Sequence, residues 1–120
     1  MKQMLVVDDE PVIRKVIQDI LHDEGFDVLV ATGGRGMLEL LKWERPAMIL
    51  LDIMMPDGDG RDAFEQMRSM PHIWHIPVVM MSAGVIGTSR GPLTLRFLAK
   101  PFDLGHLLEV VIGTIGTAAE

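Results

Sequence analysis

The chain contains no cysteine among its 120 residues. This absence excludes a disulfide framework and any metal site built on thiolates. The amino terminus also lacks a basic leader followed by an apolar segment, and the longest apolar runs are far too short to cross a bilayer. From these absences we predict a soluble, cytoplasmic protein that does not insert into membranes.

Positive charge is scarce as well. The chain has 11 lysines and arginines against 17 aspartates and glutamates, which gives a formal net charge of -6, and no basic cluster offsets it locally. Proteins that bind nucleic acid use basic side chains to neutralise phosphate groups. We therefore expect no direct nucleic-acid partner.

Apolar residues are abundant and make up 48% of the chain. A chain of this length and composition can bury a sizeable core, and it falls in the usual size range of a single domain. No repeat, linker or low-complexity segment divides the sequence. We predict one domain over residues 1–120.

Two kinds of apolar pattern alternate along this domain. Short continuous runs bounded by Asp, Gly, Pro or Ser are typical of strands buried on both faces. Helical patterns, with apolar residues three and four positions apart, separate them; Gly25 can end the first helix and Asp103 can cap the last. The runs lie at residues 4–7, 28–31, 48–51, 78–81 and about 95–99, and the helical patterns at 12–21, 37–41, 63–67 and 104–115.

This alternation predicts an α/β fold of the doubly wound type. Strand and helix follow each other in turn, which favours a five-stranded parallel sheet with right-handed crossovers and helices on both faces. In such sheets, ligands bind at the carboxyl ends of the strands. The residues that follow the apolar runs are therefore the candidates for function.

Polar groups follow four of the five predicted strands. Asp8 and Asp9 follow the first, Asp52 the third, Ser82 the fourth and Lys100 the fifth. Adjacent carboxylates repel one another unless a cation or solvent compensates their charge. Three carboxylates with no thiol partner form a hard oxygen site that suits Mg²⁺ or Mn²⁺. An ammonium and a hydroxyl beside such a metal could neutralise and orient a phosphoryl group.

Four segments, VVDDEP, LLDIMMPDGDG, VVMMSA and LAKPF, occur in this order and together resemble the receiver domains of bacterial two-component response regulators. The chain is similar to the single-domain chemotaxis regulator, and the resemblance covers essentially all of it. The resemblance implies a flavodoxin-like receiver fold and dependence on Mg²⁺. It also implies that a sensor histidine kinase or phosphotransfer protein donates a phosphoryl group to Asp52, which switches the binding of a downstream protein.

The resemblance assigns a role to each acidic residue. Asp52 would be the nucleophile that carries the phosphoryl group as an acyl phosphate. Asp9, Asp52 and the backbone carbonyl of Met54 would ligate the metal directly. Asp8 would act largely through a bound water molecule.

The remaining roles that the resemblance implies concern the switch. Lys100 would pair with Asp52 at rest and with the phosphoryl group afterwards, and a cis bond to Pro101 would aim its ammonium into the site. Ser82 would move to bond a phosphoryl oxygen, and the rotamer of Phe97 would follow that movement. Phe97 has no hydroxyl, so a readout through a tyrosine hydroxyl is absent.

Several of these residues also have a purely structural interpretation. The acidic run after the first strand could favour the dipole of the following helix. Ser82 could simply bond the backbone, and Phe97 could be only core. The segment DGDGRD has Arg61 and Asp62 where a calcium loop needs Asp or Asn and then Gly, so we interpret it as a turn into the third helix. We expect His72 and His75 on a loop surface.

Two other function classes are open at this point. A magnesium-dependent aspartyl phosphatase would place a second acid two residues after the nucleophile, where this chain has Met54. A degenerate receiver that binds partners without phosphorylation would lose an acid, the acceptor or the lysine, and here all are present. We therefore expect a signalling domain and not an enzyme, one that catalyses only its own phosphorylation and slow dephosphorylation.

The chain departs from the family between Ser82 and Lys100. Seventeen residues separate them, fewer than receivers typically have, and residues 83–94 include three glycines and a proline. Each interior glycine costs a helix about 1 kcal/mol relative to alanine, and proline costs about 3 kcal/mol. We predict a short, irregular or mobile connection over residues 83–94 in place of a regular fourth helix, with partner recognition that differs from the family's usual mode.

Overall fold

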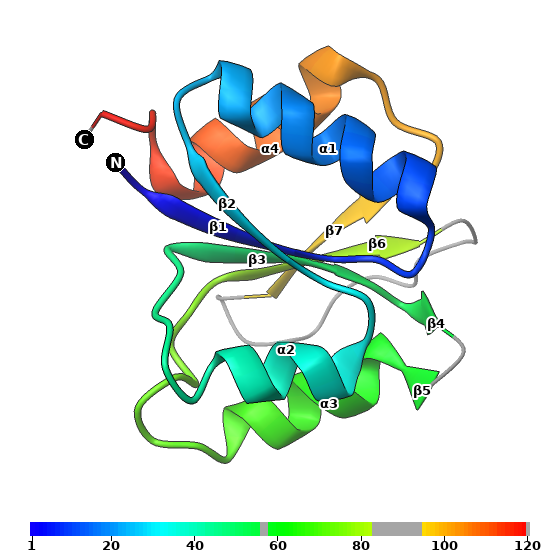
Figure 1. Cartoon of the computed structure of the whole chain (residues 1–120), viewed down its shortest axis with the longest axis vertical. Coiled ribbons are helices and arrows are strands. Elements are labelled where there is room, and N and C mark those ends of the chain that lie inside the picture. The colour runs from blue at the N-terminus through cyan, green and yellow to red at the C-terminus, as the bar shows by residue number, and fades with distance from the viewer. Residues whose placement is uncertain (56–57, 83–94, 120) are drawn as a thin grey trace.

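A five-stranded parallel sheet forms the centre of the molecule (Figure 1). The computed structural model describes residues 1–55, 58–82 and 95–119. The strand order is β2-β1-β3-β6-β7, and every neighbouring pair is parallel. The five predicted strands are thereby confirmed: β1 Gln3–Val7, β2 Asp27–Ala31, β3 Met48–Asp52, β6 Val78–Ser82 and β7 Leu95–Ala99.

Helices cover both faces of this sheet. Figure 1 shows α1 (Pro11–Asp23) and α4 (Leu104–Ile115) on one face and α2 (Gly34–Leu40) and α3 (Gly60–Arg68) on the other. The doubly wound arrangement predicted from the alternating patterns is confirmed. Among the described residues, no helix is both long and apolar enough to cross a membrane.

Two apolar cores separate the sheet from its two helical layers. Along β1, Met4 and Val6 belong to the core under α1 and α4, whereas Leu5 and Val7 belong to the core under α2 and α3. This alternation follows from the two-residue period of a strand. All five residues of β3 are buried, so the strand that ends at Asp52 is held from both faces.

The boundaries of the helices that flank the site have clear local causes. Pro11 occupies the start of α1, where its missing N–H would have no partner in any case. Gly25, with φ +94°, closes the other end: its N–H donates to His22 at 2.9 Å and that of Phe26 donates to Leu21 at 3.0 Å. At the start of α4, the carboxylate of Asp103 accepts the N–H of His106 at 2.7 Å, as the sequence predicts.

A short antiparallel ribbon before α3 was not predicted. The DGDGRD segment, interpreted as a turn, contains β5 (Gly58–Asp59), which pairs with β4 (Met54–Met55) just before that segment. Strands of two residues carry no readable periodicity, which explains the difference. Figure 1 places the ribbon beyond the carboxyl end of β3, the strand whose last residue is Asp52.

Two further expectations concern loops. His72 and His75 are exposed in the connection between α3 and β6, as predicted. The short or irregular connection predicted over residues 83–94 lies outside the described residues.

Candidate metal centre

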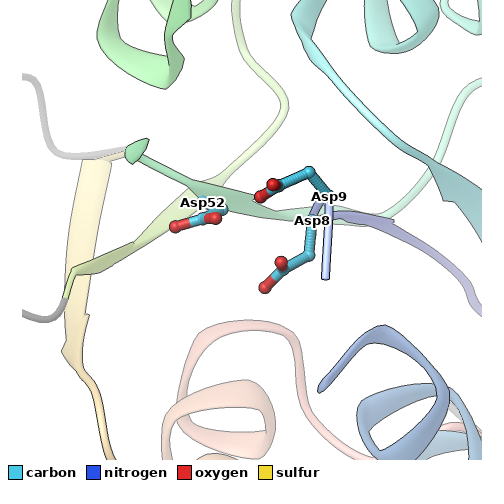
Figure 2. Close-up of side chains that lie close together, drawn as sticks. All are labelled: Asp8, Asp9 and Asp52. Carbon is cyan, nitrogen blue, oxygen red and sulfur yellow. The ribbon is translucent and has the colours of Figure 1, made fainter. Parts of the chain in front are cut away.

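Three carboxylates meet at the carboxyl edge of the sheet (Figure 2). Asp8 and Asp9 follow β1, and Asp52 is the last residue of β3. Because these two strands are parallel neighbours, both deliver their side chains to the same edge. One oxygen from each carboxylate can be chosen so that all three lie within 4.8 Å of one another. The sequence predicted this convergence.

Hydrogen bonds hold both the side chain and the backbone of Asp8. Its Oδ1 accepts the backbone N–H of Glu10 at 2.9 Å, and its carbonyl oxygen accepts a hydrogen bond from the guanidinium of Arg14 at 3.0 Å. Its own N–H donates to Ala31 on β2 at 3.2 Å. The side chain is fully buried, whereas Asp9 is partly exposed. The pair therefore presents one buried carboxylate held by hydrogen bonds and one that is partly exposed.

Lys100 brings a positive charge to this acidic cluster from the end of β7. Its Nζ lies 2.9 Å from Asp8 Oδ2 and 3.4 Å from Asp52 Oδ1. Its backbone N–H donates to the carbonyl of Ser82 at 2.7 Å, and the bond to Pro101 is cis. The resemblance implied a resting pair with Asp52. The structure gives Lys100 both carboxylates, with Asp8 the closer.

Burial and charge shift the pKa values in this cluster. Burial raises the pKa of Asp52, and the nearby charge of Asp8 raises it further, while Lys100 only partly offsets these effects. Burial by itself lowers the pKa of Lys100, but its hydrogen bond to Asp8 and the charges of Asp8 and Asp52 raise that pKa overall. Among the residues that the structure describes at this edge, three carboxylates thus lie near one ammonium. A divalent cation bound to oxygen ligands would relieve the remaining repulsion.

The other predicted site residues lie around this cluster. Ser82 ends β6 and is half-buried, and its neighbour Met81 pairs with Asp52. The backbone N–H of Met54 faces Asp52 Oδ1 at 3.4 Å, and its side chain is 71% exposed. Phe97 lies in the middle of β7, half-buried against the core under α2 and α3.

Two residues that contact the site were missed in the sequence. Arg14 holds the carbonyl of Asp8 from the first turns of α1. Gly60 begins α3 against the backbone of Asp52 and Ile53. An arginine on a helix and a glycine near a turn are common in any chain, so neither carries a signal that sequence alone could separate from the background.

Comparisons with known proteins agree with this arrangement. Residues 4–112 match the family described as the response regulator receiver domain. Regulatory protein AtoC of Escherichia coli is 34% identical over 113 residues, which cover 91% of this chain and 24% of AtoC. Response regulator Rre1 of Synechocystis is 36% identical over 113 residues, which cover 90% of this chain and 49% of Rre1. The chain therefore spans half or less of the length of these curated relatives.

Solved structures of similar fold agree with these sequence comparisons. The Vibrio cholerae chemotaxis protein CheY4 superposes with a TM-score of 0.87 at 26% identity, covering 95% of this chain and 98% of that one. The receiver domain of the Pseudomonas aeruginosa sensor histidine kinase PA1611, solved with a magnesium ion in its active site cleft, gives 0.85 at 26% identity, with 97% and 98% covered. The chain belongs to the family of response regulator receiver domains.

Proposed function

We propose that this receiver domain is a phosphoacceptor that takes a phosphoryl group onto Asp52 in a reaction that depends on Mg²⁺. The donor would be a phosphohistidine on a sensor histidine kinase or phosphotransfer protein. The observation that carries the proposal is the meeting of Asp8, Asp9 and Asp52 with the ammonium of Lys100 at one edge of the sheet.

The donor set fits a hard divalent cation. Asp9 and Asp52 would bind Mg²⁺ with the carbonyl of Met54, and the buried Asp8 would act largely through water. Mn²⁺, which takes the same ligands, could replace it. When bound, the ion would neutralise negative charge shared by the carboxylate and the phosphoryl oxygens. The magnesium in the PA1611 receiver supports this choice of metal.

The chain's own residues would carry out the transfer. A carboxylate oxygen of Asp52 attacks phosphorus in line, forming an O–P bond as the P–N bond to the donor imidazole breaks. The ammonium of Lys100 would then move from the Asp52 carboxylate to a phosphoryl oxygen, and the hydroxyl of Ser82 would donate a hydrogen bond to another phosphoryl oxygen. Movement of Ser82 would change the packing of Phe97, and this change would alter binding of a downstream protein.

We do not propose that the domain hydrolyses small phosphorylated substrates. Aspartyl phosphatases need a general acid near the nucleophile, and the residue two positions after Asp52 is Met54, whose side chain cannot give a proton. Slow loss of the phosphoryl group to water would return the domain to its resting state.

Incubation with acetyl phosphate and Mg²⁺ tests the proposal without a kinase. Wild-type protein should gain one phosphate that resists acid and is lost in base, and EDTA should prevent labelling. Absence of labelling in Mg²⁺, with metal binding shown separately, would favour the alternative of a module that binds partners without phosphorylation.

A further inference from the structure

Gly60 touches the backbone that carries Asp52. Its N–H donates to the carbonyl of Ile53 at 2.7 Å, and the residue is buried at the start of α3. A Cβ at this position would overlap the carbonyl oxygen of Asp52 and would lie 3.1 Å from its carbonyl carbon and 3.2 Å from Ile53 Cα. All three are backbone atoms, so no rotation of a side chain can relieve the overlap.

Strand β6 of the sheet also fixes the Asp52–Ile53 segment. Asp52 pairs with Met81 of β6, and the N–H of Ile53 donates to the Met81 carbonyl at 3.0 Å. Within the Asp52–Ile53 segment, the N–H of Ile53 is therefore held by β6 and the C=O of Ile53 by Gly60. A methyl group at position 60 must displace either this segment or the start of α3.

We propose that Gly60 is a positioning residue: its lack of a side chain sets where the Asp52 carboxylate stands relative to Asp8, Asp9 and Lys100. A small displacement of Asp52 would matter, because its Oδ1 is only 3.4 Å from Lys100 Nζ and its carboxylate belongs to the acidic cluster with Asp8 and Asp9. A displacement of roughly 1 Å at such a site can cost about 100-fold in rate. The phosphoryl-transfer part of this inference rests on the proposed function, while the metal-binding part does not.

The direct test compares Gly60→Ala with Gly34→Ala. Gly34 begins α2, and a Cβ there would lie 2.9 Å from the Cβ of Ala63 on α3, so this change strains helix packing without touching Asp52. Mn²⁺ affinity is measured by electron paramagnetic resonance titration, and folding by circular dichroism and thermal denaturation. We expect Gly60→Ala to weaken Mn²⁺ binding and slow acetyl phosphate labelling by at least about tenfold. Gly34→Ala should lower Tm and leave Mn²⁺ affinity within about twofold of wild type.

A double-mutant cycle separates positioning from general damage. If Gly60 acts through the Asp52 carboxylate, Gly60→Ala should weaken Mn²⁺ binding by less than about twofold in an Asp52→Asn background. If Gly60→Ala weakens Mn²⁺ binding by the same factor in both backgrounds, the inference is overturned. It is also overturned if Gly60→Ala folds and keeps the Mn²⁺ affinity and labelling rate of wild type.

Folding of the variant decides the remaining outcomes. Should Gly60→Ala unfold in buffer, the measurements are repeated in trimethylamine N-oxide, which favours compact states. A variant that stays unfolded there would assign Gly60 to folding and overturn the positioning role. If wild type binds Mn²⁺ but is never labelled, the proposed function fails, and the Mn²⁺ comparison still decides the role of Gly60.

Discussion

The ammonium of Lys100 lies closer to Asp8, at 2.9 Å, than to Asp52, at 3.4 Å. The partly buried ammonium of Lys100 is therefore shared between the fully buried carboxylate of Asp8 and the proposed phosphoacceptor, Asp52. A divalent cation that enters the site must bind near the same oxygens. A bound metal would thus compete with Lys100 for the negative charge of these carboxylates.

This competition predicts the effect of Lys100→Met. The variant should bind Mg²⁺ several-fold more tightly, because a competing positive charge is removed from the carboxylates. It should still accept phosphate from acetyl phosphate, while phosphorylation-dependent binding of a partner weakens, since Lys100 can no longer couple the phosphoryl group to the loop after β7. Isothermal titration calorimetry measures the affinity.

Lys42→Met provides a matched control for this change. Lys42, just after the end of α2, forms an exposed pair with Glu39 at 3.0 Å, so its removal changes net charge equally without reaching the site. Equal gains of Mg²⁺ affinity in both variants would show that net charge, and not the competition at Asp8 and Asp52, is responsible.

Asp52→Asn should abolish labelling by acetyl phosphate, because the amide cannot form the acyl phosphate. Asp23→Asn, at the last residue of α1, makes the same chemical change away from the cluster and should leave the stoichiometry at one phosphate. Mass spectrometry of the intact protein gives the result. Undiminished labelling of Asp52→Asn would mean that another residue is the acceptor.

The pKa of Asp52 also predicts a dependence of stability on pH. Burial and the charge of Asp8 raise this pKa in the folded, metal-free state, so the folded state holds the proton more firmly than the unfolded state does. The stabilisation from the protonated group is complete below the unfolded pKa of about 4 and is lost as pH rises through the folded value. In EDTA, Asp52→Asn should therefore gain stability relative to wild type over this range, measured as the free energy of unfolding in urea. A difference that stays constant with pH would contradict the shift.

Asp9→Ala tests the metal site from its open side. Asp9 contributes an oxygen to the acidic cluster and is partly exposed, so its loss should weaken Mg²⁺ binding by about tenfold or more with little effect on folding. Asp19→Ala removes an equal charge from an exposed pair with Lys15 on α1 and should change the affinity by less than about twofold. Unchanged affinity in Asp9→Ala would require a different set of ligands.

The main elements of the fold could be predicted because each has its own local signal. The central strands are buried on both faces and therefore read as continuous apolar runs, and Gly25 and Asp103 carry the backbone chemistry of helix ends. The convergence of Asp8, Asp9 and Asp52 follows once the strands are parallel neighbours. In contrast, the β4–β5 ribbon is too short to have a period.

Contacts between distant backbone segments could not be predicted in the same way. The sequence shows that position 60 is glycine, but the overlap that a Cβ would make with Asp52 exists only after the chain returns to the end of β3. The sharing of Lys100 between two carboxylates likewise rests on a small difference between two distances, 2.9 Å to Asp8 and 3.4 Å to Asp52. These relationships are set by how the folded chain packs, and no local sequence pattern encodes them.

An apolar groove beside the site predicts where the proposed phosphodonor protein would bind. The groove, of about 470 Å³, runs between α1 and the residues after β7, and Lys100 forms part of its wall. Val12 and Val16 on α1 are 76% and 51% exposed. Its other lining residues are Glu10, Ile13, Ile17, Pro101 and Phe102. Because Lys100 lines the groove and lies 3.4 Å from Asp52, an apolar surface of the proposed donor bound there would lie near the acceptor.

Val16→Glu should therefore separate the two phosphodonors. A charge in the groove must be desolvated when an apolar partner binds, so transfer from a phosphohistidine protein that labels wild type should slow by at least about tenfold. Labelling by acetyl phosphate, which needs no docking, should keep its wild-type rate. Trp43→Glu is the control, because Trp43 is 81% exposed after the end of α2 and does not line the groove. If Val16→Glu slows both donors equally, the substitution has damaged the site itself. If it slows neither, the donor docks elsewhere on the domain.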